Sequence, residues 1–216
     1  MLFRSEVADC RAQYGCTPVE LWQRLGGLDD RFVAAHCVHF TESDIRAFAA
    51  AGATAVLNPT SNLKLCSGIP PIPVLLAGGV KLALGTDGAS SNNSLDMHAE
   101  MKLAALLAKV QGSAETLPAQ TALDMATRNV ARAYGLPDGT GEIREGAPAD
   151  CLLVDLGNER MAPCHDLVSN WVYSADSTAI DTVICAGRIL MRHRHVDGEE
   201  EIVKEAQACA HRLASR

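Results

Sequence analysis

Residues 84–93, LGTDGASSNN, join the apolar run Val80–Leu84 to the Ala-, Leu- and Met-rich segment Leu95–Val110. The apolar run is typical of a short buried strand, the Gly/Ser/Asn stretch of a loop, and the long segment of a helix. Two earlier units repeat this order: Arg31–Val38 with a helix over 41–51, and Ala53–Leu57 with the loop 58–68 and a helix over 70–77. Three consecutive strand–loop–helix units predict an α/β fold with parallel strands.

The pattern differs on both sides of these units. Residues 6–25 predict one helix that ends at Gly26-Gly27, and residues 121–134 predict an amphipathic helix. Beyond it the sequence becomes β-rich, and Ala186-Gly187 has the character of a hairpin turn. The expected strands are Ile143, Asp150–Leu156, Asp181–Cys185 and Arg188–Met191, and a last helix begins at Glu199. We therefore expect a parallel βα part over 1–135, a β-rich part over 136–198 and a C-terminal helix over 199–216.

The composition excludes some classes of protein. The 216 residues carry a net charge of −7, which argues against non-specific binding to nucleic acid. No run of 18 apolar residues is present, and the first residues lack an apolar core of signal-peptide length, so we expect no membrane partner. None of the eight cysteines forms a CxxC pair, which disfavours a zinc knuckle. We expect free, buried thiols in a cytoplasmic protein.

Two polar residues stand where parallel βα folds place functional side chains, at the C-terminal ends of strands. His36 ends the first apolar run and Asp87 follows the third. An imidazole and a carboxylate on neighbouring strand ends could bind a divalent metal or move protons. The alternative is structural, because an Asp before Gly is a common turn residue and a lone His often only completes a hydrogen bond.

The loops 58–62 (NPTSN) and 90–94 (SSNNS) add small polar groups that suit a substrate. The alternative is turn and helix-cap chemistry, which we expect for Ser94. His193 and His195 have the spacing of a metal-binding pair, but two arginines flank them, so we interpret them as a solvated hairpin end. We interpret His39 as structural. The remaining histidines are expected on the surface: His98, His165 and His211.

Four long motifs together resemble the amidohydrolase superfamily, and within it most closely the 5′-methylthioadenosine/S-adenosylhomocysteine deaminases. They are AHCVHF (35–40), NPTSNLKLCSGIPP (58–71), LALGTDGASSNNSLDMHAEM (82–101) and GEIREGAPADCLLVDL (141–156). The resemblance runs from about Glu6 to the C-terminus. It implies the last three βα units of a (β/α)8 barrel, followed by the β-rich part of a composite sandwich. Guanine and 8-oxoguanine deaminases and triazine hydrolases of the same superfamily are the alternatives.

The resemblance also implies a chemistry. One divalent metal, usually zinc, activates a water that attacks the purine carbon bearing the amino group, and ammonia leaves. Asp87 would be a metal ligand and a proton shuttle, and His36 would lie beside the attacking hydroxide. Ser61 and Asn62 would line the substrate side. The implied partner is a small-molecule nucleoside, and members of the family often form homo-oligomers.

The sequence departs from the family in one respect. An HxH pair and an HxxE motif, which supply further metal ligands and a proton donor, belong ahead of the matched region, and the residues before Glu6 contain neither. A closed barrel also needs eight βα units and about 250 residues. We therefore expect the chain to be the C-terminal half of a longer hydrolase acting on C–N bonds, inactive when isolated. The alternative is an inert truncated chain, or a module that docks on a homologous subunit.

Overall fold

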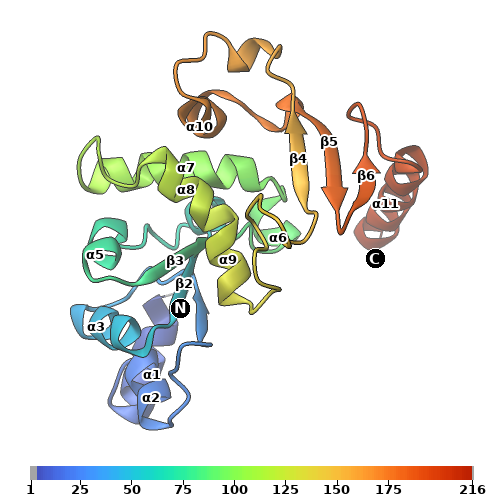
Figure 1. Ribbon diagram of the computed structural model, residues 1–216. Coiled ribbons are helices and arrows are strands. Elements are labelled where there is room, and N and C mark those ends of the chain that lie inside the picture. Colours follow the sequence, from blue (N-terminus) through green and yellow to red (C-terminus); the bar gives the residue numbers. More distant parts are fainter. Residues whose placement is uncertain (1–3, 216) are drawn as a thin grey trace.

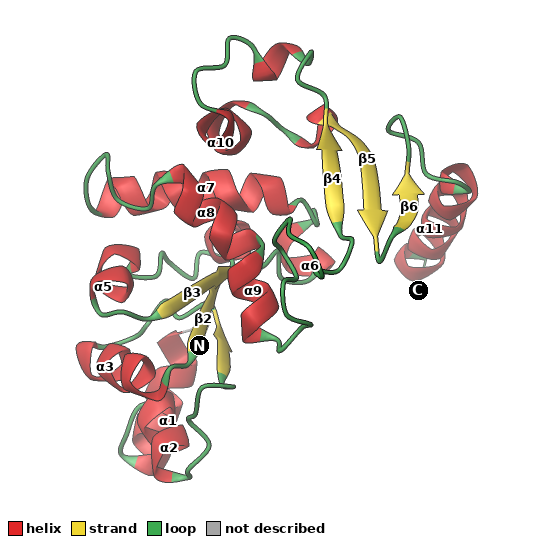
Figure 2. Ribbon diagram, in the orientation of Figure 1, coloured by secondary structure: helices red, strands yellow, loops and turns green. Residues whose placement is uncertain are grey.

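The computed structural model describes residues 4–215. The sequence predicts no signal-peptide core at the start of the chain, and the first three residues of that segment, 1–3, lie outside the described residues. Figure 1 shows a helix-rich part around one sheet and a smaller part around a second sheet. We call residues 4–133 the parallel region and residues 151–191 the antiparallel region. Figure 2 shows that the strands of the two regions form separate sheets.

The first sheet contains β1 (Val33–Ala35), β2 (Thr54–Leu57) and β3 (Lys81–Leu84) in the order β1-β2-β3. Both pairs of neighbours are parallel, which confirms the predicted α/β arrangement. All four residues of β2 are buried. A central strand of a parallel sheet is covered on both faces, and this explains why its sequence, TAVL, does not alternate with charged residues.

The helix α3 (Glu42–Ala51) between β1 and β2 begins and ends as its sequence predicts. Thr41 accepts a hydrogen bond from the backbone N–H of Asp44, and the Asp44 carboxylate accepts one from the backbone N–H of Thr41. This reciprocal capping satisfies N–H groups that no helical carbonyl can reach. At the other end Gly52 adopts φ 69°, a left-handed conformation that glycine allows without strain.

Two predicted helices are each broken in two. Residues 6–25 form α1 (Arg4–Tyr14) and α2 (Pro18–Arg24), because Gly15 takes φ 68° and Thr17 starts a new capped helix at Pro18. Residues 121–134 lie in α8 (Ala119–Ala126) and α9 (Arg128–Ala133). Thr127, at φ −124° and ψ −99°, leaves the helical conformation between them. The bend allows both helices to contact β3.

The loops after β2 and β3 contain short helices that the sequence does not predict. They are α4 (Pro59–Lys64) and α6 (Ala89–Asn92). The expected helices that follow them are confirmed with shorter or shifted bounds, as α5 (Ile72–Ala77) and α7 (Met97–Gln111). Asp96, and not Ser94, caps α7 with its side chain; Ser94 accepts a hydrogen bond from the Asp96 N–H. Ser94 therefore has the turn contact that the sequence predicts, and the helix cap lies two residues further on.

The second sheet contains β4 (Cys151–Val154), β5 (Ile180–Cys185) and β6 (Arg188–Met191), all antiparallel. Ala186 (φ 49°) and Gly187 (φ 74°) form the predicted hairpin turn. Ile143 is not in a strand and is 95% exposed, so that expectation is wrong. Short helical turns lie between β4 and β5, and α11 (Glu199–Ala214) follows β6 as predicted. The turns are η1 (Glu159–Met161), α10 (Leu167–Ser169), η2 (Asn170–Ser174) and η3 (Ser177–Ala179).

The parallel region holds the larger hydrophobic core. Its buried members come from the sheet, from the helices that pack on it and from η2, with Phe48, Leu57 and Leu75 fully enclosed. Of the cysteines, all eight are free but only Cys16 and Cys37 are buried, so the expectation of buried thiols is wrong for the others, which lie in poorly covered parts of the chain. Among residues 4–215, no helix is long and apolar enough to cross a membrane.

Candidate functional site

The site lies where the three parallel strands end. The His36 N–H donates to the Val56 carbonyl (2.8 Å) and thus continues the β1–β2 ladder by one residue. The Gly85 N–H donates to the Leu57 carbonyl (3.0 Å) and does the same for β2 and β3, with Asp87 two residues further on. The carboxyl ends of parallel strands meet at one edge of a sheet. The expectation of neighbouring strands is wrong, because β2 lies between β1 and β3, but the ends of these two strands still bring His36 and Asp87 to the same edge.

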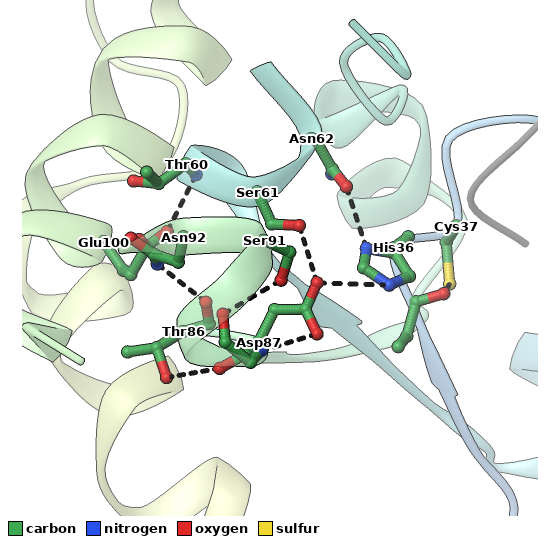
Figure 3. A network of polar contacts seen from close by, with 12 residues as sticks. His36, Cys37, Thr60, Ser61, Asn62, Thr86, Asp87, Ser91, Asn92 and Glu100 are labelled. Carbon is green, nitrogen blue, oxygen red and sulfur yellow. Dashed lines mark hydrogen bonds and ion pairs between the residues drawn. The ribbon is translucent and has the colours of Figure 1, made fainter. Parts of the chain in front are cut away.

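The two side chains face each other (Figure 3). His36 Nε2 lies 3.9 Å from Asp87 Oδ2, and the side chains are 13% and 30% exposed. Both residues, and Cys37 beside His36, have positive φ angles of 70°, 61° and 49°. Non-glycine residues adopt this conformation at a cost of about 1–3 kcal/mol, and such residues cluster at functional sites. The backbone is thus held in a strained shape at the two residues that the sequence singles out.

Asn62, in α4, fixes the orientation of the His36 ring. Asn62 Oδ1 lies 2.8 Å from His36 Nδ1. A carbonyl oxygen only accepts hydrogen bonds, so Nδ1 carries the proton in this pair. The other ring nitrogen, Nε2, faces Asp87. A neutral imidazole in this state can accept a proton or bind a cation at Nε2.

Asp87 is held as a carboxylate by several donors. Ser61 Oγ donates to Oδ2 (2.6 Å) and the Gly88 N–H donates to Oδ1 (2.8 Å). Burial raises the pKa of Asp87, but hydrogen bonds from Ser61, Gly88 and Ser91, with the nearby His36, outweigh it and lower the pKa below its ordinary value. The carboxylate is therefore ionised at neutral pH.

Ser61 and Asn62 are buried, and their side chains form hydrogen bonds with Asp87 and His36, respectively. The structure brings all four expected site residues into one cluster. It places Ser61 and Asn62 as supports of the other two, and their contact with a substrate stays a prediction.

Two further buried residues belong to this edge of the sheet: Glu100 in α7, which the sequence does not single out, and Asn92 in α6, which the sequence places in a loop suited to a substrate. Both are buried, and Glu100 accepts hydrogen bonds from Asn92 Nδ2 (2.8 Å) and from the Thr60 N–H (3.0 Å). The position of Glu100 in the sequence does indicate that it has a buried partner. Glu100 lies three residues after Met97 and four before Ala104, on the apolar face of α7, where a charged side chain needs a buried partner.

His36 and Asp87 suit a metal but do not complete a metal site. Hydrolytic zinc sites use about three protein ligands. Among residues 4–215, no group of three or more His, Cys, Asp or Glu side chains is placed to hold an ion. Cys37 is adjacent to His36, but its thiol donates to the Ala34 carbonyl, and burial raises its pKa to about 12, so it is no thiolate ligand. The described residues therefore supply fewer ligands than a hydrolytic zinc site needs.

Four of the other histidines lie where the sequence predicts them. His193 and His195 are exposed and contact Asp181 and Glu199, as the interpretation of a solvated hairpin end requires. His165 and His211 are exposed as expected. His98 is not on the surface: it is buried, its Nε2 contacts the Trp171 carbonyl, and its ring packs edge-on against Trp171. The expectation for His98 is wrong because the η2 turn, distant in sequence, covers it.

Comparisons with known proteins match the chain to one sequence family and to several related enzymes. The sequence model of the Amidohydrolase family matches residues 4–190. A 5-methylthioadenosine/S-adenosylhomocysteine deaminase from Moorella thermoacetica is 48% identical over 201 residues, 91% of this chain and 47% of that protein. The structure of an adenosine deaminase from Xanthomonas campestris with bound zinc matches with a TM-score of 0.95 and 38% identity, over 100% of this chain and 50% of the other.

A third similar protein is a chlorohydrolase and not a deaminase. The structure of an atrazine chlorohydrolase from Arthrobacter aurescens, complexed with zinc, matches with a TM-score of 0.87 and 28% identity, over 95% of this chain and 46% of the other. In all three comparisons the chain spans about half the length of the protein it matches.

Proposed function

The chain belongs to the amidohydrolase family, and from this premise we propose that it carries the His36 and Asp87 part of the catalytic site of a metal-dependent aminohydrolase. The substrate class is the adenosine-like nucleosides, including 5′-methylthioadenosine and S-adenosylhomocysteine. The observation that carries the proposal is the approach of His36 Nε2 to Asp87 Oδ2 at the ends of β1 and β3, with both groups fixed by buried partners.

The proposed reaction replaces an amino group with oxygen. Water adds to the ring carbon that bears the amine, the C–N bond breaks, and ammonia leaves. Asp87, ionised at neutral pH, accepts a proton from the water and delivers it to the departing nitrogen. His36, whose ring is oriented by the contact of Nδ1 with Asn62, holds the water through Nε2. Ser61 keeps the carboxylate directed at the same point.

The complete site needs more than these residues. We propose that it binds one divalent metal, zinc being the ion named in the Xanthomonas and Arthrobacter structures. Its further ligands would come from outside residues 4–215. In this proposal β1–β3 are the last three strands of a (β/α)8 barrel, residues 136–198 belong to a composite sandwich, and the separate chain is inactive.

The proposal also covers the partner, the oligomeric state and the location of the protein. The partner is a small-molecule nucleoside and neither a nucleic acid nor a membrane, in keeping with the net charge of −7. A homo-oligomer and a cytoplasmic location also stay proposals; the eight free thiols suit a reducing compartment.

A chimera tests the proposed function. This chain would replace the matched segment of the Moorella relative, and the purified protein would be loaded with zinc and assayed for ammonia release from 5′-methylthioadenosine. We expect turnover by the chimera, a loss of at least roughly 100-fold with Asp87→Asn, and none by the separate chain. A folded, zinc-loaded chimera that releases no ammonia, or an Asp87→Asn chimera that keeps its activity, would contradict the proposal.

A second candidate is a hydrolase of triazines, favoured by the likeness to the atrazine chlorohydrolase. The same chimera distinguishes the two, because a chlorohydrolase releases chloride from atrazine where a deaminase releases ammonia. Guanine and 8-oxoguanine, assayed in parallel, test the other aminohydrolase alternatives.

A further inference from the structure

We infer that Glu100 is a positioning residue that sets the distance between α4, which carries Ser61 and Asn62, and the loop 85–93, which carries Asp87. The side-chain hydrogen bonds of Glu100 go to Thr60 and Asn92, and to neither His36 nor Asp87. Its two carboxylate oxygens instead reach one element on each side of the site. The importance of this role for catalysis rests on the proposed function, but the geometry does not.

The first connection is to α4. Pro59 and Thr60 form the first turn of this helix, whose cap residue, Asn58, makes no side-chain capping bond and leaves its Oδ1 buried without a partner. The Thr60 N–H instead donates to Glu100 Oε2 (3.0 Å), from a residue 40 positions away. Glu100 thus caps α4 in place of Asn58. A carboxylate also suits the positive end of a helix.

The second connection is to the loop that follows β3. Asn92 Nδ2 donates both to Glu100 Oε1 (2.8 Å) and to the Thr86 carbonyl (2.7 Å). Thr86 directly precedes Asp87, as Thr60 directly precedes Ser61. Figure 3 shows the resulting ring of contacts. It runs from Glu100 through α4 to Ser61, across the 2.6 Å bond to Asp87, and back through Thr86 and Asn92.

Burial makes the ring rigid. Glu100 is 1% exposed and Asn92 5% exposed, so water cannot readily replace a lost partner. A buried carboxylate without its donors is strongly disfavoured. If either connection is cut, α4 and the loop 85–93 must therefore move until the remaining groups find partners. The first contacts affected are those of Ser61 with Asp87 and of Asn62 with His36.

The chain offers a matched control in Asp44. It is also a fully buried carboxylate, and it accepts hydrogen bonds from the Thr41 N–H (2.9 Å) and from the Thr17 hydroxyl. None of its partners belongs to the site. Asp44→Asn therefore disturbs the fold in a similar way to Glu100→Gln without altering the ring of contacts.

The test is 15N NMR of the His36 imidazole in the purified chain, which reports which ring nitrogen carries the proton. We expect a single Nδ1–H form in the parent chain and in Asp44→Asn. In Glu100→Gln, and in Asn92→Ala, which cuts only the second connection, we expect that single form to be lost. The inference fails if His36 keeps the Nδ1–H form in both of these variants, or if Asp44→Asn changes it equally.

The chimera supplies a second readout. Glu100→Gln should lower kcat by roughly 10- to 100-fold, because the proton-handling groups move, and should raise KM to the extent that Ser61 and Asn62 contact the nucleoside. Asp44→Asn should leave both constants unchanged. An unsubstituted chimera without turnover would contradict the proposed function, and the NMR result would still decide the role of Glu100.

Discussion

The parallel region buries its apolar side chains more completely than the antiparallel region does. In the parallel region, β2 is buried along its whole length, and helices cover the sheet. In the antiparallel region, the buried core is Met161, Ala175 and Ala179, while Leu152 and Leu153 are each about half exposed. Successive residues of a strand point to opposite faces, so β4 is open on both of its faces. The candidate site is built entirely on the region that holds the larger core.

The largest contrast is expected between two leucines of equal size. Leu57→Ala in β2 should lower the free energy of unfolding by about 2–5 kcal/mol, because it leaves a cavity in a closed core. Leu153→Ala in β4, where the side chain is 52% exposed, should cost about 0.5 kcal/mol or less. Urea unfolding followed by circular dichroism measures both. Equal losses would show that the two regions are packed alike.

A smaller difference is expected in acid. The pKa of Asp87 lies below its unfolded value, so its carboxylate stabilises the fold above about pH 4, and this contribution is lost as the pH falls through the lower folded pKa. The parent chain should therefore lose stability more steeply below about pH 4 than Asp87→Asn. Ser61→Ala, which removes a donor, should reproduce part of that change.

Asp181 in β5 is the counterpart of Asp87 in the other region. A hydrogen bond from Thr182, the next residue, is the main cause that lowers the pKa of Asp181. Because neighbours in sequence can also make this contact in the unfolded chain, Asp181→Asn should change the acid dependence less than Asp87→Asn. Thermal unfolding between pH 2 and 6 compares the variants, and a larger effect at Asp181 would contradict this explanation.

The smallest effect is expected on the open sheet. Leu152 borders two hollows of about 580 and 550 Å³, lined mainly by apolar side chains including Leu123 and Trp171. Exposed apolar surface of this kind binds hydrophobic dyes. Fluorescence of such a dye should fall with Leu152→Asn and stay unchanged with Leu57→Val. Unchanged dye binding in Leu152→Asn would place the open surface elsewhere.

The sequence predicts those features that local patterns determine. The apolar runs and caps predict three parallel strands, and strand ends then bring His36 and Asp87 to one edge. Contacts between distant segments are beyond such patterns. The break at Thr127 lets α9 turn towards β3, where Asn129 Nδ2 donates to the Leu82 carbonyl. Glu100 likewise finds its partner Thr60 40 residues away.

The most direct test of the paired roles of His36 and Asp87 is a crystal structure of the zinc-loaded chimera, with the metal located by anomalous scattering. We expect the zinc about 2.0–2.2 Å from a carboxylate oxygen of Asp87, on the side that faces His36 Nε2. A zinc ion bound elsewhere in an active chimera, with Asp87 outside its coordination shell, would contradict the assignment of this edge of the sheet as the catalytic centre.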